Sequence, residues 1–89
     1  MKKKIAVIVR ERQAEALRMG LGLTILNDEI EIYLMKRLED AMGSSPDLSL
    51  MRELGMKIYT IFKENSDFEV LSQEEMARRL LEYDAVLAY

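Results

Sequence analysis

Cysteine, histidine and tryptophan are all absent from this 89-residue sequence. Without cysteine the chain forms no disulfide and offers no thiolate to a metal or a substrate. Without histidine it lacks the commonest protein ligand of metals and the commonest general base at neutral pH. Thiol-based and histidine-based catalysis are therefore excluded, enzymatic activity is not favoured, and we expect neither a metal nor a cofactor.

Long apolar runs and an excess of basic residues are lacking too. The apolar run that follows the N-terminal lysines, residues 5–9, ends at Arg10 and is too short for the hydrophobic part of a signal peptide. No segment approaches the roughly 20 apolar residues of a membrane span. The 13 basic and 16 acidic residues are well mixed and give a net charge of −3, unlike the basic surface of a nucleic-acid-binding protein. We therefore expect a cytoplasmic protein without a membrane or nucleic-acid partner.

The residues that are present predict one α/β domain, residues 1–89, because the chain is too short for two domains. Residues 5–9 form an apolar, β-branched run typical of a strand that is buried on both faces. A polar turn, residues 10–13, comes next, and apolar residues then recur at helical spacing over residues 14–25. Strand, turn and helix make the first half of a βαβ unit.

The same alternation continues to the last residues. We predict further strands at 29–35, 57–62, 68–71 and 85–89, further helices at 45–54 and 72–83, and a short helical turn within 36–43. Ser45 and Pro46 fit the start of a helix and Gly55 fits the residue after its end, while Ser72 to Glu75 is a capping box. Strands alternating with helices predict a parallel sheet with helices on both faces.

The polar turn after the first strand is the best candidate for a ligand site. Open α/β sheets bind ligands at the carboxyl ends of their strands, and this turn places the guanidinium groups of Arg10 and Arg12 beside a helix N-terminus, where anions bind. Ser44 and Lys63 follow the next two predicted strands and belong to the same end of the sheet. These four residues are our candidate ligand-binding residues. The alternative is that the two arginines are solvated and pair with neighbouring glutamates.

The first helix predicts self-association. Its apolar residues surround the helix instead of sharing one face, so a second side must be buried against something. A domain of this size without a disulfide also gains from association. We expect a homo-oligomer, a trimer or a hexamer ahead of a dimer, with a hydrophobic interface that includes Met19, Leu23 and Leu26. The alternative is that residues 36–54 cover this helix within one chain.

Three segments of the sequence resemble the DsrE/DsrF-like family of small sulfur-relay proteins, and the match spans nearly the whole chain. They are the first strand with its helix (residues 4–24), Glu-Ile-Tyr-Leu-Met at 31–35, and Leu-Gly-Met-Lys-Ile-Tyr-Thr at 54–60. The resemblance implies a three-layer α/β/α sandwich with a five-stranded parallel sheet in the order 4-3-2-1-5. It also implies assembly into homo- or hetero-oligomers.

The same resemblance locates a missing catalytic residue. Active members of the family carry a cysteine just after the third strand and pass persulfide sulfur between proteins, whereas this sequence has Ile61, or one of its neighbours Thr60 and Phe62, at that position. Persulfide transfer needs a thiolate, so the resemblance implies a non-catalytic binding or assembly protein associated with sulfur relay. Its partners would be copies of itself or a cysteine-bearing DsrE-like or sulfur-carrier protein. The alternative is an enzyme or binding module for an anionic small molecule at the carboxyl ends of the strands.

Overall fold

The predicted alternation of strands and helices is confirmed. The computed structural model describes residues 3–24, 29–39, 45–65 and 68–89. The elements are β1 (Lys4–Val9), α1 (Gln13–Thr24), β2 (Glu29–Leu34), α2 (Pro46–Glu53), β3 (Ile58–Thr60), β4 (Glu69–Val70), α3 (Gln73–Leu80) and β5 (Ala85–Ala88). Within these described ranges, no helix is long and apolar enough to cross a membrane.

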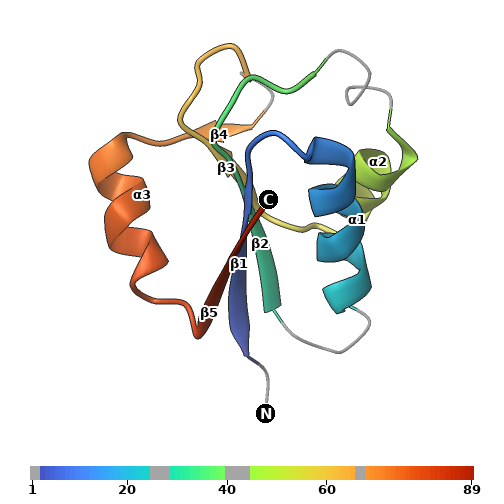
Figure 1. Cartoon of the computed structure of the whole chain (residues 1–89), viewed down its shortest axis with the longest axis horizontal. Helices are drawn as coiled ribbons and strands as arrows, with labels where there is room; N and C mark the ends of the chain where they lie inside the picture. The colour runs from blue at the N-terminus through green and yellow to red at the C-terminus, as the bar shows by residue number, and fades with distance from the viewer. Residues whose placement is uncertain (1–2, 25–28, 40–44, 66–67) are drawn as a thin grey trace.

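The strands form one parallel sheet in the order β4-β3-β2-β1-β5. Helices α1 and α2 cover one face of the sheet and α3 covers the other, so that the molecule is a three-layer α/β/α sandwich (Figure 1). Both the architecture and the strand order are those that the resemblance implied. The strand β1 lies between β2 and β5, and its carboxyl end is therefore flanked by theirs.

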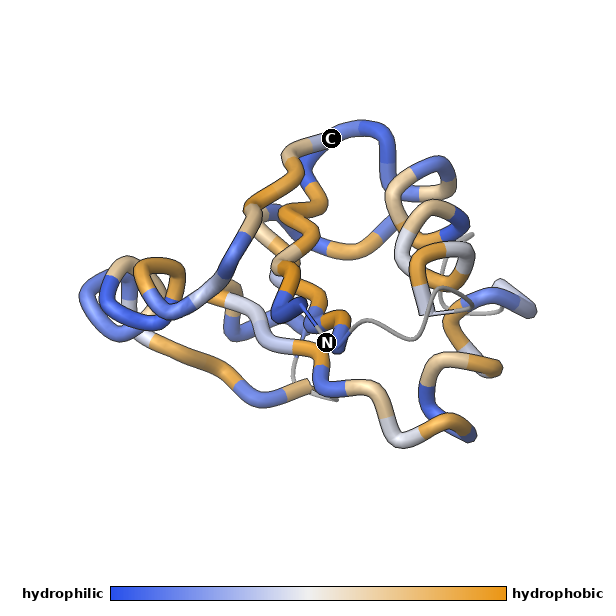
Figure 2. Tube along the Cα trace, turned by 90° about the horizontal axis from the view of Figure 1, so that it is seen from below, coloured by the Kyte–Doolittle hydropathy of each residue, from blue (hydrophilic) through white to orange (hydrophobic). Residues whose placement is uncertain are grey.

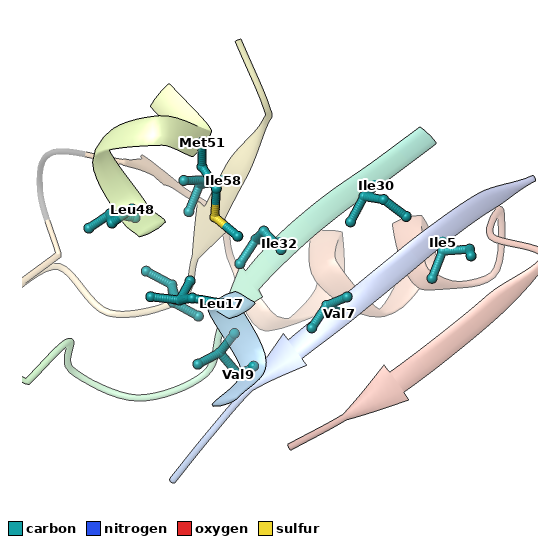
Figure 3. Close-up of a cluster of buried hydrophobic side chains, with 11 residues drawn as sticks. Ile5, Val7, Val9, Leu17, Ile30, Ile32, Leu48, Met51 and Ile58 are labelled. Atoms are coloured by element: carbon teal, nitrogen blue, oxygen red, sulfur yellow. The ribbon is translucent and has the colours of Figure 1, made fainter. Parts of the chain in front are cut away.

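The larger part of the core lies between the sheet and the layer of α1 and α2. Alternate residues of the central strands point to this side, and Leu17 of α1 and Met51 of α2 are fully buried against them (Figure 3). The strand residues of this cluster are Ile5, Val7, Val9, Ile30, Ile32, Leu34 and Ile58. Figure 2 shows the same arrangement as hydrophobic strands in the middle of the molecule. Burial of these side chains is the main force that holds α1 against the sheet.

The opposite face carries a smaller core under α3. Ala6, Tyr33 and Tyr59 of the strands pack there with Leu71 and Met76. The predicted cap of α3 is confirmed, because the hydroxyl of Ser72 accepts a hydrogen bond of 3.1 Å from the N–H of Glu75. Leu71 and Met76 flank that cap and are both buried, as a hydrophobic staple requires.

Two predictions about the connection before β3 have different outcomes. The helix α2 begins at Pro46 after Ser45 and is followed by Gly55 with a positive φ of 73°, as predicted, although the Ser45 side chain makes no capping hydrogen bond. The helical turn predicted within 36–43 is wrong for residues 36–39, which are not helical; the rest of it lies outside the described residues. Side chains from elsewhere in the fold bond to the backbone of 36–39, as set out below, and this competes with a local helical turn.

The apolar residues of α1 differ in how far the chain itself covers them. Leu21 and Leu23 are partly buried against the main core, while the side chain of Met19 is 38% exposed; Leu26 lies outside the described residues. The helix α2 packs beside α1 in the same layer, so part of the segment 36–54 does cover α1 within one chain.

Gly20 lets α1 approach the sheet closely. A Cβ atom at Gly20 would lie 2.9 Å from Cδ1 of Ile32 and 3.1 Å from Cε of Met51, whereas a Cβ atom at Gly22 would meet nothing within 4 Å. Both neighbours of Gly20 are fully buried, so there is little free space into which they can move.

We therefore expect Gly20→Ala and Gly22→Ala to differ in stability, although both replace a helical glycine. Gly22→Ala should raise the free energy of unfolding by about 0.5 kcal/mol, because alanine is the better helix former. Gly20→Ala gains the same helix propensity but forces the ends of the Ile32 and Met51 side chains to shift within a packed core, which should leave it about 1 kcal/mol less stable than Gly22→Ala. Urea unfolding of both variants at one protein concentration measures the difference, and equal stabilities would contradict the close approach.

Candidate functional site

A pocket of about 490 Å³ opens at the carboxyl ends of β1 and β5. We call it the carboxyl-end pocket. It is lined by Arg10, Glu11, Arg12, Lys36, Ala88 and Tyr89. These residues come from the turn after β1, the segment after β2, and the end of β5. Three segments that are distant in sequence therefore meet at one site.

Backbone hydrogen bonds beyond the ends of the strands place these residues. The N–H of Arg10 donates to the carbonyl of Tyr89 at 2.7 Å, and the N–H of Tyr89 donates to the carbonyl of Ile8 at 2.9 Å. On the other side of β1, the N–H of Met35 donates to the carbonyl of Val9 at 2.9 Å. The three strands are thus locked together up to their last residues, and polar side chains begin just beyond.

The pocket is cationic but contains one carboxylate. The ammonium group of Lys36 lies 3.0 Å from Oε1 of Glu11, and a guanidinium nitrogen of Arg12 lies 3.8 Å from Oε2 of Glu15, which is not among the lining residues. All four side chains are more than half exposed. The hydrogen bond from Lys36 lowers the pKa of Glu11 below its usual value, with a smaller contribution from the charge of Arg10. The carboxylate of Glu11 is therefore ionised at neutral pH.

Two buried amide side chains hold the segment that carries Lys36. Nε2 of Gln13 donates to the carbonyl of Arg37 at 3.0 Å, and its Oε1 accepts from the N–H of Glu39 at 2.8 Å. Oδ1 of Asn65 accepts from the N–H of Leu38 at 2.9 Å, and its Nδ2 donates to the carbonyl of Lys36 at 3.0 Å. Both amides are less than 10% exposed. The backbone around Lys36 is thus fixed by four side-chain hydrogen bonds.

Thr60 completes this network at the end of β3. Its hydroxyl is fully buried, donates to the carbonyl of Leu34 at 3.0 Å, and accepts from Nδ2 of Asn65 and from the N–H of Phe62, each at 3.1 Å. Ile61, the residue that the resemblance assigned to the missing cysteine, is partly buried and packs into the core under α3. Thr60 and Ile61 therefore serve the packing of the strands at this position.

The structure brings together two of the four predicted ligand-binding residues. Arg10 and Arg12 line the carboxyl-end pocket, whereas Lys63 is exposed but does not line it, and Ser44 lies outside the described residues. Sequence reasoning missed Lys36 and Tyr89. Lys36 follows the second strand as Arg10 follows the first. This shared placement beyond a strand end could have predicted that Lys36 belongs to the site. The position of Tyr89 depends on β5 pairing with β1, which periodicity alone does not reveal.

A second polar cluster lies on the face of the sheet that α3 covers. The sequence did not predict it. Glu31 is only 6% exposed, and its Oε1 accepts a hydrogen bond from the hydroxyl of Tyr83. The same hydroxyl lies 2.5 Å from the hydroxyl of Tyr33. Burial raises the pKa of both tyrosines above the usual value, and the bond to Glu31 raises that of Tyr83 further. This chain of hydrogen bonds makes a buried carboxylate tolerable within the sheet.

A pocket of about 330 Å³ borders this cluster near the amino ends of the strands, but the chain's own cations occupy its aromatic faces. The ammonium of Lys4 and the guanidinium of Arg79 each lie 4.9 Å from a ring centroid, of Tyr83 and Tyr59 respectively. Across the described ranges, no cluster of three or more acidic side chains has the arrangement of a metal site. The carboxyl-end pocket is therefore the stronger candidate site.

Comparison of the sequence with models of protein families found no match, and comparisons with curated proteins and with solved structures found none either. Function is therefore inferred from this chain's own residues and their geometry.

We expect Asn65→Ala to destabilise the protein, because it removes the bonds that hold the segment after β2. The partly buried N–H of Leu38 and the carbonyl of Lys36 would lose their side-chain partner, which should lower the free energy of unfolding by about 1–3 kcal/mol. Glu64→Ala, at the exposed neighbouring position, should change it by less than about 0.5 kcal/mol. Urea unfolding measures both, and similar values for the two variants would contradict a holding role for Asn65.

Proposed function

We propose that this chain is a non-catalytic binding protein with a DsrE-like fold, and that its ligand is a small anionic molecule held in the carboxyl-end pocket. The convergence of Arg10, Arg12 and Lys36 on one pocket carries the proposal. The volume of about 490 Å³ lies within the range of small-molecule sites, about 300–1,000 Å³.

The place of the pocket in the fold supports a ligand there. The strand order reverses between β1 and β5, and open α/β sheets bind their ligands outside the carboxyl ends of the strands at such a point. The two guanidinium groups suit oxyanions such as phosphate, sulfate or carboxylate, because each offers several N–H donors in one plane. Binding of this kind requires no nucleophile and no general base.

We expect Arg10→Ala and Lys36→Ala each to weaken the binding of sulfate or inorganic phosphate by at least about threefold, because each removes one charged hydrogen-bond donor from an exposed site. Lys63→Ala is the matched control: it removes the same charge at the same end of the sheet but outside the pocket. Isothermal titration calorimetry at low ionic strength measures the affinities. If Lys63→Ala weakens binding as much as the other two variants, the anion responds to net charge alone and the proposed site is wrong.

A second candidate function is assembly, with other copies of this chain or with a cysteine-bearing DsrE-like or sulfur-carrier protein. The strand order supports it, because it matches the order that the family resemblance implies. The outer side of α1 also supports it, with a largely apolar groove of about 450 Å³ lined by Glu15, Arg18, Met19, Gly22 and Leu23. Another copy of this chain is the expected occupant, since a small domain without a disulfide gains stability by association.

Light scattering at micromolar concentration tests the assembly. We expect a mass that is a multiple of 10.3 kDa, a trimer or a hexamer ahead of a dimer, and little sensitivity to salt because the contact is hydrophobic. Met19→Glu should shift the mass towards the monomer, whereas Leu81→Glu, at an 86% exposed position on the other side of the sheet, should not. A monodisperse mass near 10.3 kDa that does not change on dilution would exclude the oligomer.

A further inference from the structure

The carboxyl-end pocket already contains an anion, because Glu11 is one of its lining residues. Its carboxylate takes a hydrogen bond of 3.0 Å from the ammonium of Lys36, in a pocket that also presents Arg10 and Arg12. Among the described residues that line the pocket, Glu11 is the only acidic one, and the backbone around Lys36 is held by Gln13 and Asn65. The carboxylate thus occupies a position at which the oxygen of a bound anion would meet a donor.

We propose that Glu11 is a built-in competitor of the ligand, and that an oxyanion group enters the pocket by replacing the Glu11 carboxylate at the ammonium of Lys36. This inference rests on the proposed anion-binding function. It adds a way in which the chain itself regulates that binding. It also narrows the ligand to one that carries a dianionic group, such as a sulfate or a phosphate monoester. Once the Glu11 carboxylate has left, Arg10, Arg12 and Lys36 offer three positive charges, which favour a dianion over a monoanion.

The exchange is physically reasonable because both partners of the existing ion pair are exposed. The side chain of Glu11 is 78% exposed and that of Lys36 is 53% exposed, so the carboxylate can swing into solvent without leaving a buried charge behind. Exposed ion pairs of this kind are weak, so an oxyanion that also contacts the guanidinium groups can displace the carboxylate. The lowered pKa of Glu11 agrees with the position of the carboxylate, because the positive charges around the carboxylate stabilise its ionised form.

Glu11→Gln tests the competition directly. It removes the competing charge from the pocket and should tighten the binding of sulfate by roughly threefold to tenfold. Glu53→Gln is the matched control, because it makes the same change of charge at an exposed position at the end of α2, outside the pocket lining. Sulfate is the probe because it stays dianionic across the accessible pH range. Titration calorimetry at constant ionic strength measures the affinities, and Glu53→Gln should leave the affinity for sulfate within about twofold of wild type.

A second measurement uses the wild-type chain and does not depend on any variant. If sulfate displaces Glu11 from Lys36, the pKa of Glu11 must rise when sulfate is bound, because binding and protonation are linked reciprocally. The carboxyl carbon of Glu11, followed by NMR during titrations with and without saturating sulfate, reports this rise. A pKa of Glu11 that is the same or lower in the presence of sulfate would overturn the displacement.

The outcomes separate the two proposals. If Glu11→Gln binds sulfate no more tightly than wild type while Arg10→Ala and Lys36→Ala weaken binding, the site is real and the competition is wrong. If both Glu11→Gln and Glu53→Gln tighten binding equally, net charge explains the effect and the competition is again wrong. If neither wild type nor Glu11→Gln binds sulfate, the proposed anion site fails and the competition fails with it.

Discussion

The central strand β1 is the constraint on which the rest of this structure depends. It pairs in parallel with β2 over six residues and with β5 over four, so both of its edges are hydrogen-bonded. Both of its faces are covered as well: Val7 and Val9 are fully buried towards α1 and α2, and Ala6 is fully buried towards α3. After Lys4 at its start, a strand enclosed on four sides leaves no room for further charged groups before its end. The charges of this segment therefore begin at Arg10, where the strand stops.

The carboxyl-end pocket follows from that arrangement. In a parallel sheet the carboxyl ends of neighbouring strands lie at the same edge, and the order β4-β3-β2-β1-β5 makes β2 and β5 the neighbours of β1. Arg10, Lys36 and Tyr89 thereby meet although they are far apart in the sequence. The polar groups under α3, near the amino ends of the strands, differ from those of the carboxyl-end pocket. Lys4 and Arg79 lie over tyrosine rings, and Glu31 accepts a hydrogen bond from a tyrosine of the same chain. Side chains of the carboxyl-end pocket are the more exposed and the more available to a ligand.

The polar residues at the end of β3 connect two strands and the segment after β2. The hydroxyl of Thr60 joins β3 to β2 and to Asn65, and Asn65 in turn bonds to the backbone of Lys36. The side chains of Thr60 and Asn65 are buried and would be costly to leave without a partner. The polar residues here therefore connect the end of β3 to the segment that carries a cation of the pocket. They support the backbone of the candidate site next to them.

Local sequence was sufficient for the elements of this protein, because each depends on near neighbours. The β-branched run at 5–9, the cap at Ser72 and the glycine after α2 predicted a strand, a helix start and a helix end that are all confirmed. The placement of Arg10 and Arg12 beyond the first strand was predictable for the same reason. The strand order was anticipated only through a family resemblance, since periodicity does not say which strands pair.

Tertiary structure alone decided the remaining features, because they depend on contacts between distant segments. Residues 36–39 have a sequence that suits a helical turn, yet Gln13 and Asn65 bond to their backbone and hold them in an irregular path. Tyr89 joins the pocket only because β5 pairs with β1, and Lys63 is excluded from its lining because β3 lies two strands away from β1. The sequence by itself thus determined which elements form and where the charges begin, while the packing of the sheet determined which of those charges face one another.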